Sequence, residues 1–501
     1  MAPPVGGTNP HINPLALAEQ LYHNEIVLHP PVDFDRVPSL QSNVFLRPML
    51  DLSQFLALTI FVLLFIAIVV GKVHRFIPAL IGAGLTVVVV FLLVMRKPEA
   101  VSSVLNLGQL GQLHFWIAGQ EHVETHGVNW QTIIFIGGMM AMVESMGEVG
   151  FFNWLCLSIA KLVKYRVVPI FISFMLISGF LAMFIDSITV LLFMTAIVIE
   201  LARLLKIDPV PMIIAMIFAA NTGGSATMSG DPPNIIIGTS LGYTFTDFAI
   251  NTGPIAWIGM LAALAFFYFT FRKSLASQTT SAPASARYPE PKEAITNPLL
   301  FKVNIAIFVL VIILLVTHAE TGLSVALIGV IAACLTLVAA LKRATHILKR
   351  VDWRTLLFFL GLFICVGGLE ETGLLEFLAK FIGDLSGGSI GIVTPIILWF
   401  SAFASAIVDN IPFAAAMVPV IAGLSQTSGL PLPPLAWTLA LGTDIGGNAT
   451  PIGASANVVG TAIAQKEGYP ITWRRFLKYS VPPTILVLGL CWLYLWLRYI
   501  L

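Results

Sequence analysis

Two stretches of this 501-residue chain, residues 221–234 and 444–457, share one sequence pattern. The first reads Asn-Thr-Gly-Gly-Ser-Ala-Thr-Met-Ser-Gly-Asp-Pro-Pro-Asn, and the second reads Asp-Ile-Gly-Gly-Asn-Ala-Thr-Pro-Ile-Gly-Ala-Ser-Ala-Asn. They lie 223 residues apart, and the same offset pairs Asp186 with Asp409. The chain is therefore predicted to consist of two copies of one unit. Both copies are apolar around this segment, and repeated breaks in apolar helices are the best sequence indication of a transporter's binding site.

The composition places the chain in a lipid bilayer. Hydrophobic residues make up 57% of it and charged residues 11%, whereas soluble domains are about 25% charged. The net charge of +1 does not bear on nucleic-acid binding, but the lack of a basic cluster or nucleic-acid-binding module argues against that class of protein. The chain has no P-loop, and its four cysteines have no metal-ligand spacing. We expect no enzyme and no cofactor, apart from a possible bound sodium ion.

About 20 apolar residues span a bilayer, and this length divides the chain into ten predicted crossings. The crossings are 52–71, 76–95, 130–147, 254–271, 302–316, 323–341, 356–369 and 481–500, with two broken helices at about 209–242 and 435–464. Residues 166–205 and 390–425 each read as two apolar arms around a polar tip, which predicts re-entrant hairpins.

Lysine and arginine are concentrated in loops that this topology places in the cytoplasm, as the positive-inside rule requires. The chain then starts outside, and an odd number of crossings in each repeat inverts the second repeat relative to the first. The predicted parts are an N-terminal extramembrane segment (1–51), repeat 1 (52–272), a cytoplasmic linker (273–301) and repeat 2 (302–501).

The glycine pairs are predicted to unwind both broken helices near mid-membrane, where free helix ends and uncharged oxygens bind ions or hydroxylated solutes. Carboxylates inside a membrane are costly and functional by default, although any one of them could instead cap a helix N-terminus. The predicted substrate- or ion-binding residues are Asp186, Ser187, Thr189, Asn221, Thr222, Gly223, Gly224, Ser225, Thr227, Asp231 and Asn234 in repeat 1, and Asp409, Asn410, Thr443, Asp444, Gly446, Gly447, Asn448, Thr450, Ser455 and Asn457 in repeat 2.

The two motifs, at 223–234 and 446–457, resemble signatures of the ion transporter superfamily. The resemblance is strongest to the branch of ArsB-type arsenite permeases, NhaD-type sodium/proton antiporters and the melanosomal P protein, and it covers the chain from residue 52 onward. It implies two inverted repeats, each with a re-entrant hairpin and a discontinuous helix at a central site. It also implies a homodimer that works by an elevator-like motion.

These features predict a secondary active transporter, multi-pass in the bacterial inner membrane or plasma membrane. Export of arsenite or antimonite, driven by a proton or sodium gradient, is the first choice of function, and sodium/proton antiport is the second. Sodium-coupled dicarboxylate or citrate symport is the third, because neither hairpin tip carries the Ser-Asn-Thr of that branch and neither broken segment contains Lys or Arg. A channel and a membrane enzyme are the alternatives from other classes of protein. A channel would not need two inverted repeats that switch between two states, and an enzyme would need a nucleophile or a metal cluster, which we do not find in the sequence.

Overall fold

A computed structural model describes residues 50–117, 126–278 and 289–501. Within these ranges the structure is built from helices, and the one β-type contact is an isolated bridge between Ile117 and Leu323. A helix pairs its own N–H and C=O groups, which is what a segment surrounded by lipid requires. The predicted all-α class is confirmed. Nearly all of the predicted N-terminal segment and the middle of the predicted linker lie outside the described residues.

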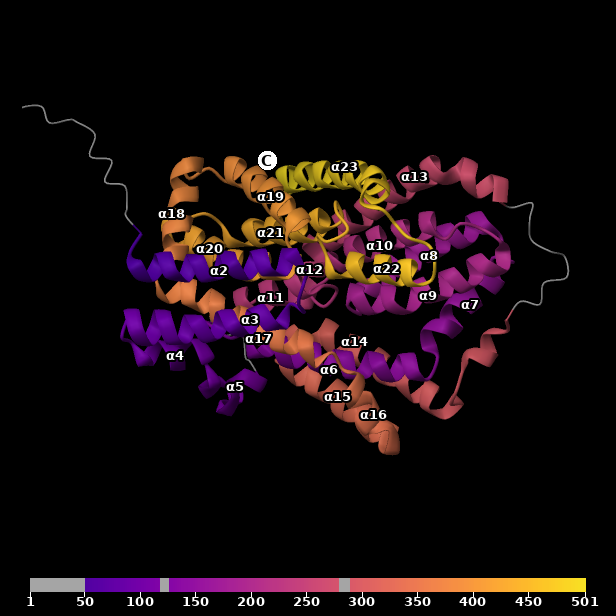
Figure 1. Ribbon diagram of the computed structural model, residues 1–501, viewed down its shortest axis with the longest axis horizontal. Helices are drawn as coiled ribbons and strands as arrows, with labels where there is room; N and C mark the ends of the chain where they lie inside the picture. The colour runs from indigo at the N-terminus through magenta and orange to yellow at the C-terminus, as the bar shows by residue number, and fades with distance from the viewer. Residues whose placement is uncertain (1–49, 118–125, 279–288) are drawn as a thin grey trace, which may run out of the picture. The chain divides into compact units, whose positions relative to one another are not determined.

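Helices of the first half run from α2 to α13 (Figure 1). They are α2 (Leu52–Val70), α3 (Phe76–Leu85) with its π-helical continuation η2 (Thr86–Val94), α4 (Pro98–Leu105), η3 (Leu107–Gly111), α5 (Leu113–Trp116), α6 (Trp130–Glu148), α7 (Phe151–Leu162), α8 (Val167–Ala182), α9 (Ser187–Leu205), α10 (Val210–Gly224), α11 (Pro232–Leu241), α12 (Phe245–Asn251) and α13 (Gly253–Gln278).

The short helix η4 (Pro291–Ala294) precedes the second half. The helices of that half are α14 (Pro298–Thr321), α15 (Val325–Ala340), η5 (Leu341–Arg343), α16 (Ala344–Arg350), α17 (Trp353–Glu371), α18 (Leu374–Ser386), α19 (Ile390–Ile407), α20 (Asn410–Ser428), α21 (Leu432–Gly447), α22 (Ser455–Lys466) and α23 (Trp473–Tyr499).

Ten segments of the described chain are long and apolar enough to cross a membrane. They are α2, α3 with η2, α9, α13, α14, α15 with α16, α17, α19, α20 and α23. A bent pair, α6 with α7, also passes as one span and would make eleven among the described residues. The number is thus close to the ten predicted crossings, but the members differ. The prediction counted α6 and the two broken helices, and it treated α9, α19 and α20 as hairpin arms. Length and hydropathy do not separate a crossing from a hairpin arm, so the hairpins and the inverted orientation stay predictions.

The two halves repeat the same local structure. The helices α6 and α17 both run from a tryptophan to a glutamate, and α9 and α20 both have 19 residues. Gly150 and Gly373 follow the first pair with left-handed φ angles of 84° and 72°, a conformation that glycine adopts without strain. The offset of 223 residues between equivalent elements therefore extends from the sequence to the helix boundaries.

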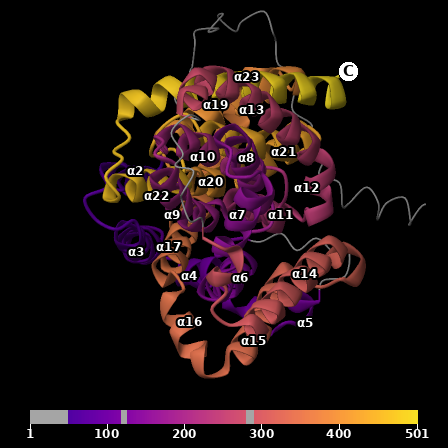
Figure 2. The same cartoon turned by 90° about the vertical axis from the view of Figure 1, so that its right-hand side faces the viewer.

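The halves are also packed into one another (Figure 2). Helix α3 of the first half packs on α17 of the second, and α6 of the first packs on α15 of the second. Likewise α9 packs on α22, and α20 packs on α11, so a hairpin arm of each half contacts the broken helix of the other. Within each half, α8 packs on α10 and α19 packs on α21. These reciprocal contacts bring both broken helices and both predicted hairpins together.

Candidate functional site

Both broken helices are interrupted at equivalent positions. Helix α10 ends at Gly224 and α11 begins at Pro232, whereas α21 ends at Gly447 and α22 begins at Ser455. Every residue of α10 is buried, as is most of α11. A buried helix end leaves carbonyl groups that need partners. The break is therefore stable only if the chain supplies them.

An asparagine supplies these partners in each half. The amide nitrogen of Asn234 donates to the carbonyls of Gly224 and Thr227, both at 3.1 Å. In the second half Asn457 makes the two equivalent bonds, both at 2.7 Å. Both asparagines are 0% exposed. Each side chain therefore closes its own break with its nitrogen, and its Oδ1 is left for other contacts.

The first glycine of each pair allows helices to approach closely. A Cβ added at Gly223 would lie 2.1 Å from the carbonyl oxygen of Gly179 in α8, and one added at Gly446 would lie 2.3 Å from the Cα of Ala402 in α19. Both distances are too short for any side chain. The predicted role of these glycines in unwinding the helix is thus only part of their function, because the helices continue to the second glycine and pack tightly at the first.

The two predicted tip carboxylates cap helices, but they have different partners. Asp186 precedes α9 and accepts from the backbone nitrogen of Thr189 at 2.9 Å and from its hydroxyl at 2.6 Å. Asp409 precedes α20 and accepts from the backbone nitrogen of Ile411 at 3.3 Å. It also accepts from the hydroxyl of Ser455 at the start of α22. The capping alternative therefore describes Asp186 well, whereas Asp409 also binds outside its own helix.

Arg75, in the segment between α2 and α3, is a functional candidate that the sequence did not indicate. Its Nη1 lies 2.9 Å from Asp409 Oδ2 and also donates to Ser455. Its Nη2 donates to the hydroxyl of Thr355 at 3.1 Å, and the guanidinium lies 4.9 Å from the ring centre of Phe358. From the sequence, Arg75 is only one of the basic residues that the positive-inside rule places in a cytoplasmic loop. The structure places its positive charge on the second hairpin tip.

Asp231 joins the first break to both predicted hairpins. Its Oδ1 accepts from the hydroxyl of Ser187 at 2.7 Å, and its Oδ2 accepts from the amide of Asn410, also at 2.7 Å. Ser187 begins α9 and Asn410 begins α20, so the three residues come from separate segments of the chain. The carboxylate is 3% exposed. This junction brings residues of both predicted tips together with the first break.

Asp444 lies next to this junction, in the last turn of α21, and is 0% exposed. Its carboxylate lies beside Asp231, Asn234 and Asn410. Among the described residues neither of its oxygens has a hydrogen-bond partner, and Oδ1 of Asn234 has none either. Two neighbouring carboxylates that are both ionised repel each other, and burial strengthens this repulsion because little water screens it. This pair of carboxylates is therefore suited to holding a positive charge.

A second polar cluster forms where the other break meets α10. The amide nitrogen of Asn221 donates to Oδ1 of Asn457 at 2.8 Å and to Oδ1 of Asn448 at 3.0 Å. Asn448 in turn donates to the hydroxyl of Thr222 at 3.3 Å. Three of the predicted asparagines, Asn221, Asn448 and Asn457, are therefore brought together, with Asn221 bonded to the other two. The hydroxyls of the remaining predicted residues bond to nearby backbone carbonyls; these residues are Ser225, Thr227, Thr443 and Thr450.

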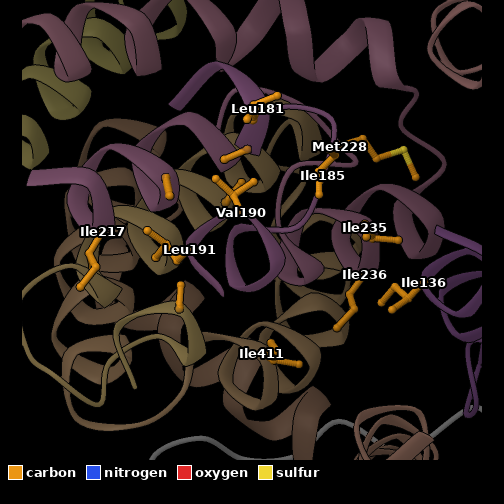
Figure 3. Close-up of a cluster of buried hydrophobic side chains, with 14 of the residues drawn as sticks. Ile136, Leu181, Ile185, Val190, Leu191, Ile217, Met228, Ile235, Ile236 and Ile411 are labelled. Atoms are coloured by element: carbon orange, nitrogen blue, oxygen red, sulfur yellow. The ribbon is translucent and has the colours of Figure 1, made fainter. Parts of the chain in front are cut away.

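Buried apolar side chains lie near the predicted tip residue Asp186. Ile136, Ile235, Ile236 and Ile411 are all buried, and Figure 3 shows them in one group with residues of α8, α9 and α10. Three of them line a small cavity next to Asp186, with an internal volume of about 20 Å³. That is close to the space needed by one water molecule. In this conformation the site is closed. A larger cavity of about 300 Å³ lies between α11, α17, α18 and α20.

Comparison with known proteins agrees with this architecture. The profile of a family described as "Citrate transporter" matches residues 65–442. An uncharacterized transporter of Mycobacterium bovis is 35% identical over 375 residues, which cover 74% of this chain and 87% of that protein. The P protein of Homo sapiens is 27% identical, over 91% of this chain and 62% of that protein. The resemblance to the branch that holds the P protein is thus confirmed.

Among solved structures, the Alcanivorax borkumensis YdaH transporter aligns with a TM-score of 0.54 at 12% identity, over 89% of this chain and 98% of that chain. Identity this low carries information about the fold alone. The fold is that of a multi-pass membrane transporter.

Proposed function

The chain belongs to the citrate transporter family, and from this premise we propose that it is a secondary active transporter of the bacterial inner membrane or plasma membrane. The observation that carries this proposal is the pair of buried carboxylates, Asp231 and Asp444, where two broken helices meet the starts of α9 and α20, the two predicted hairpin tips. A positive charge bound there would change the electrostatic energy of the central site. Binding and release of that charge on opposite sides of the membrane would couple a proton or sodium gradient to solute movement.

We propose arsenite, antimonite or a related inorganic solute as the exported substrate. Neutral arsenous acid presents hydroxyl donors, and Asn221 and Asn234 each have a buried Oδ1 that accepts from no group in the described chain. A buried acceptor without a partner costs about 1–3 kcal/mol, which a hydroxylated ligand would recover. Binding of such a ligand between the broken helices needs the site to open, because the cavity beside Asp186 is small.

Sodium/proton antiport is the second candidate. It is favoured by the predominance of carboxylate and amide oxygens around Asp231 and Asp444. In this case the transported solute is itself a cation.

Dicarboxylate or citrate symport, the third candidate, gains support from Arg75. The sequence argument against it was the absence of Lys and Arg from both broken segments. Arg75 lies outside those segments and yet contacts Asp409 and Ser455, so a positive charge is present at the second tip. An anionic substrate would have to displace Asp409 from this guanidinium.

Transport by purified protein in liposomes separates these candidates. The panel is arsenite, antimonite, sodium and citrate, each with an imposed pH gradient and with or without a sodium gradient. We expect gradient-driven arsenite movement in the wild type and in Asp384→Asn, which alters an exposed carboxylate of α18. Asp231→Asn should abolish it, because the amide keeps one acceptor oxygen in place of two and has no negative charge to hold a bound cation. Sodium-dependent proton movement without arsenite flux would replace the first candidate with the second, and citrate uptake would replace it with the third.

A further inference from the structure

The two halves place different groups at one equivalent position. Asn221 lies in the last turn of α10, and Asp444 lies 223 residues later in the last turn of α21. Both are 0% exposed. An amide and a protonated carboxyl group have nearly the same shape, and both can donate one hydrogen bond in the same direction. The hydrogen-bond partners of Asn221 and of Asp444 show how the amide and the carboxyl group differ in their roles.

The amide of Asn221 donates a hydrogen bond to Asn457, whose side chain is held in place by its own break. The nitrogen of Asn457 is held by two carbonyls of its own break. Its Oδ1 therefore faces away from the break, where it accepts from Asn221 at 2.8 Å. The N–H at position 221 thus ties α10 to the second broken helix.

In the other half the donor is missing. Asn234 is the counterpart of Asn457, and its nitrogen is held in the same way by its own break. Its Oδ1 has no partner among the described residues, and Asp444, which lies beside it, has two unpartnered oxygens. If Asp444 were ionised, its carboxylate oxygens and Oδ1 of Asn234 would be neighbouring hydrogen-bond acceptors with no hydrogen between them, in a buried interior. One hydrogen on Asp444 would reproduce the bond that Asn221 makes.

We propose that Asp444 is the single proton-binding group of the transport site and that Asn221 is its permanently neutral counterpart. This inference rests on the proposed function and deepens it, because it predicts one coupling proton for each transport cycle. In the closed state the Asp444 O–H donates to Asn234. When the site opens, the O–H bond breaks, the proton passes to water, and the carboxylate remains next to Asp231.

Other carboxylates near the site are already stabilised by partners. Both oxygens of Asp231 accept hydrogen bonds, from Ser187 and Asn410. Asp186 is held by Thr189, and Asp409 is paired with Arg75. Among the charged groups of the described chain, Asp231 is the one that lies beside Asp444. Asp444 is therefore the one of these four carboxylates that accepts no hydrogen bond within the described chain.

Infrared spectroscopy of the purified full-length protein tests this assignment without any transport. A protonated buried carboxyl group has its own C=O stretching band, which disappears when the group ionises at high pH. We expect such a band in the wild type and in the control Asp384→Asn, and we expect its loss in Asp444→Asn. Asn221→Asp should add a second band, and the swapped double variant should retain one. A band that survives in Asp444→Asn overturns the proposal, as does a wild-type band that sodium shifts but pH does not.

Liposome assays then test the coupling. Asp444→Asn should retain solute exchange across the membrane without a gradient and should lose accumulation driven by a pH gradient, because the amide imitates the protonated state. Accumulation at the wild-type level in Asp444→Asn overturns the proposal. If neither wild type nor variant moves any solute of the panel, the proposed function fails, whereas the infrared result still decides the protonation of Asp444.

Discussion

Replacement of Arg75 by glutamine should destabilise the protein by about 3 kcal/mol. The side chains of Arg75 and Asp409 are 18% and 10% exposed, so water screens their ion pair little. Removal of one partner from a buried pair typically costs about 3–5 kcal/mol, because the other charge is left without compensation. We take the lower end of that range because neither side chain is fully buried. Asp409→Asn should cost a similar amount, since it leaves the guanidinium unpaired.

The double variant distinguishes an ion pair from two independent losses. With Arg75→Gln and Asp409→Asn combined, no uncompensated charge remains, and the two amides can bond to each other. The combined loss should therefore be smaller than the sum of the single losses by about 2 kcal/mol, a coupling energy typical of residues in direct contact.

Unfolding in mixed micelles of mild detergent and SDS measures these free energies. Lys72→Gln is the matched control, because Lys72 is an exposed cation of the same loop, and it should change stability by less than about 0.5 kcal/mol. If the two single losses add to within about 0.5 kcal/mol in the double variant, the contact does not form in the membrane protein and the reasoning is wrong.

Three further outcomes follow from the structure. Gly446→Ala should destabilise the protein by about 1–3 kcal/mol, since the added Cβ would overlap the backbone of α19. Gly489→Ala is the control and should not destabilise it, because the space around Gly489 is open. Thermal unfolding in detergent compares the two variants. Asn448→Ala should impair arsenite resistance of cells that lack their own efflux system, because it removes a partner of the Asn221 amide; full resistance would exclude this cluster from the pathway. Glu293 and Thr427 are both exposed and can each be replaced by a single cysteine. An impermeant reagent should label the cysteine at 293 from the cytoplasm and the one at 427 from outside, as the positive-inside rule predicts. Labelling of both from one face would refute the inverted topology.

The repeat, the apolar helices and the two breaks could be predicted because each depends on local sequence. A glycine pair followed by proline within an apolar segment indicates a helix end whatever surrounds it. The match between the motifs then extends to the bonds they form, since Asn234 and Asn457 close their breaks identically. The offset itself therefore carries structural information, because equivalent positions in the two halves occupy equivalent environments.

Contacts between distant segments could not be predicted in this way. Arg75 and Asp409 are 334 residues apart, and Asp231 and Asn410 are 179 apart. No periodicity or motif connects such residues, because their proximity results from the packing of one half into the other. For the same reason the sequence treated all four motif carboxylates alike. Their different roles arise from their neighbours: a cap for Asp186, an ion pair for Asp409 and a junction for Asp231.

The matched and unmatched positions of the two halves have different roles. Matched residues hold the backbone: the asparagines close the breaks, the glycines admit a neighbouring helix, and the tip aspartates cap α9 and α20. Charge is distributed unequally, because Asp444 corresponds to Asn221, Asp231 corresponds to Ala454, and Arg75 forms its ion pair with Asp409 of the second predicted tip. The matched residues can give both repeats the same backbone structure. Energy coupling, however, needs a charge that is bound in one conformational state and released in another. Substitutions at the matched positions should therefore lower stability first, whereas substitutions at the unmatched carboxylates should change coupling while the fold persists.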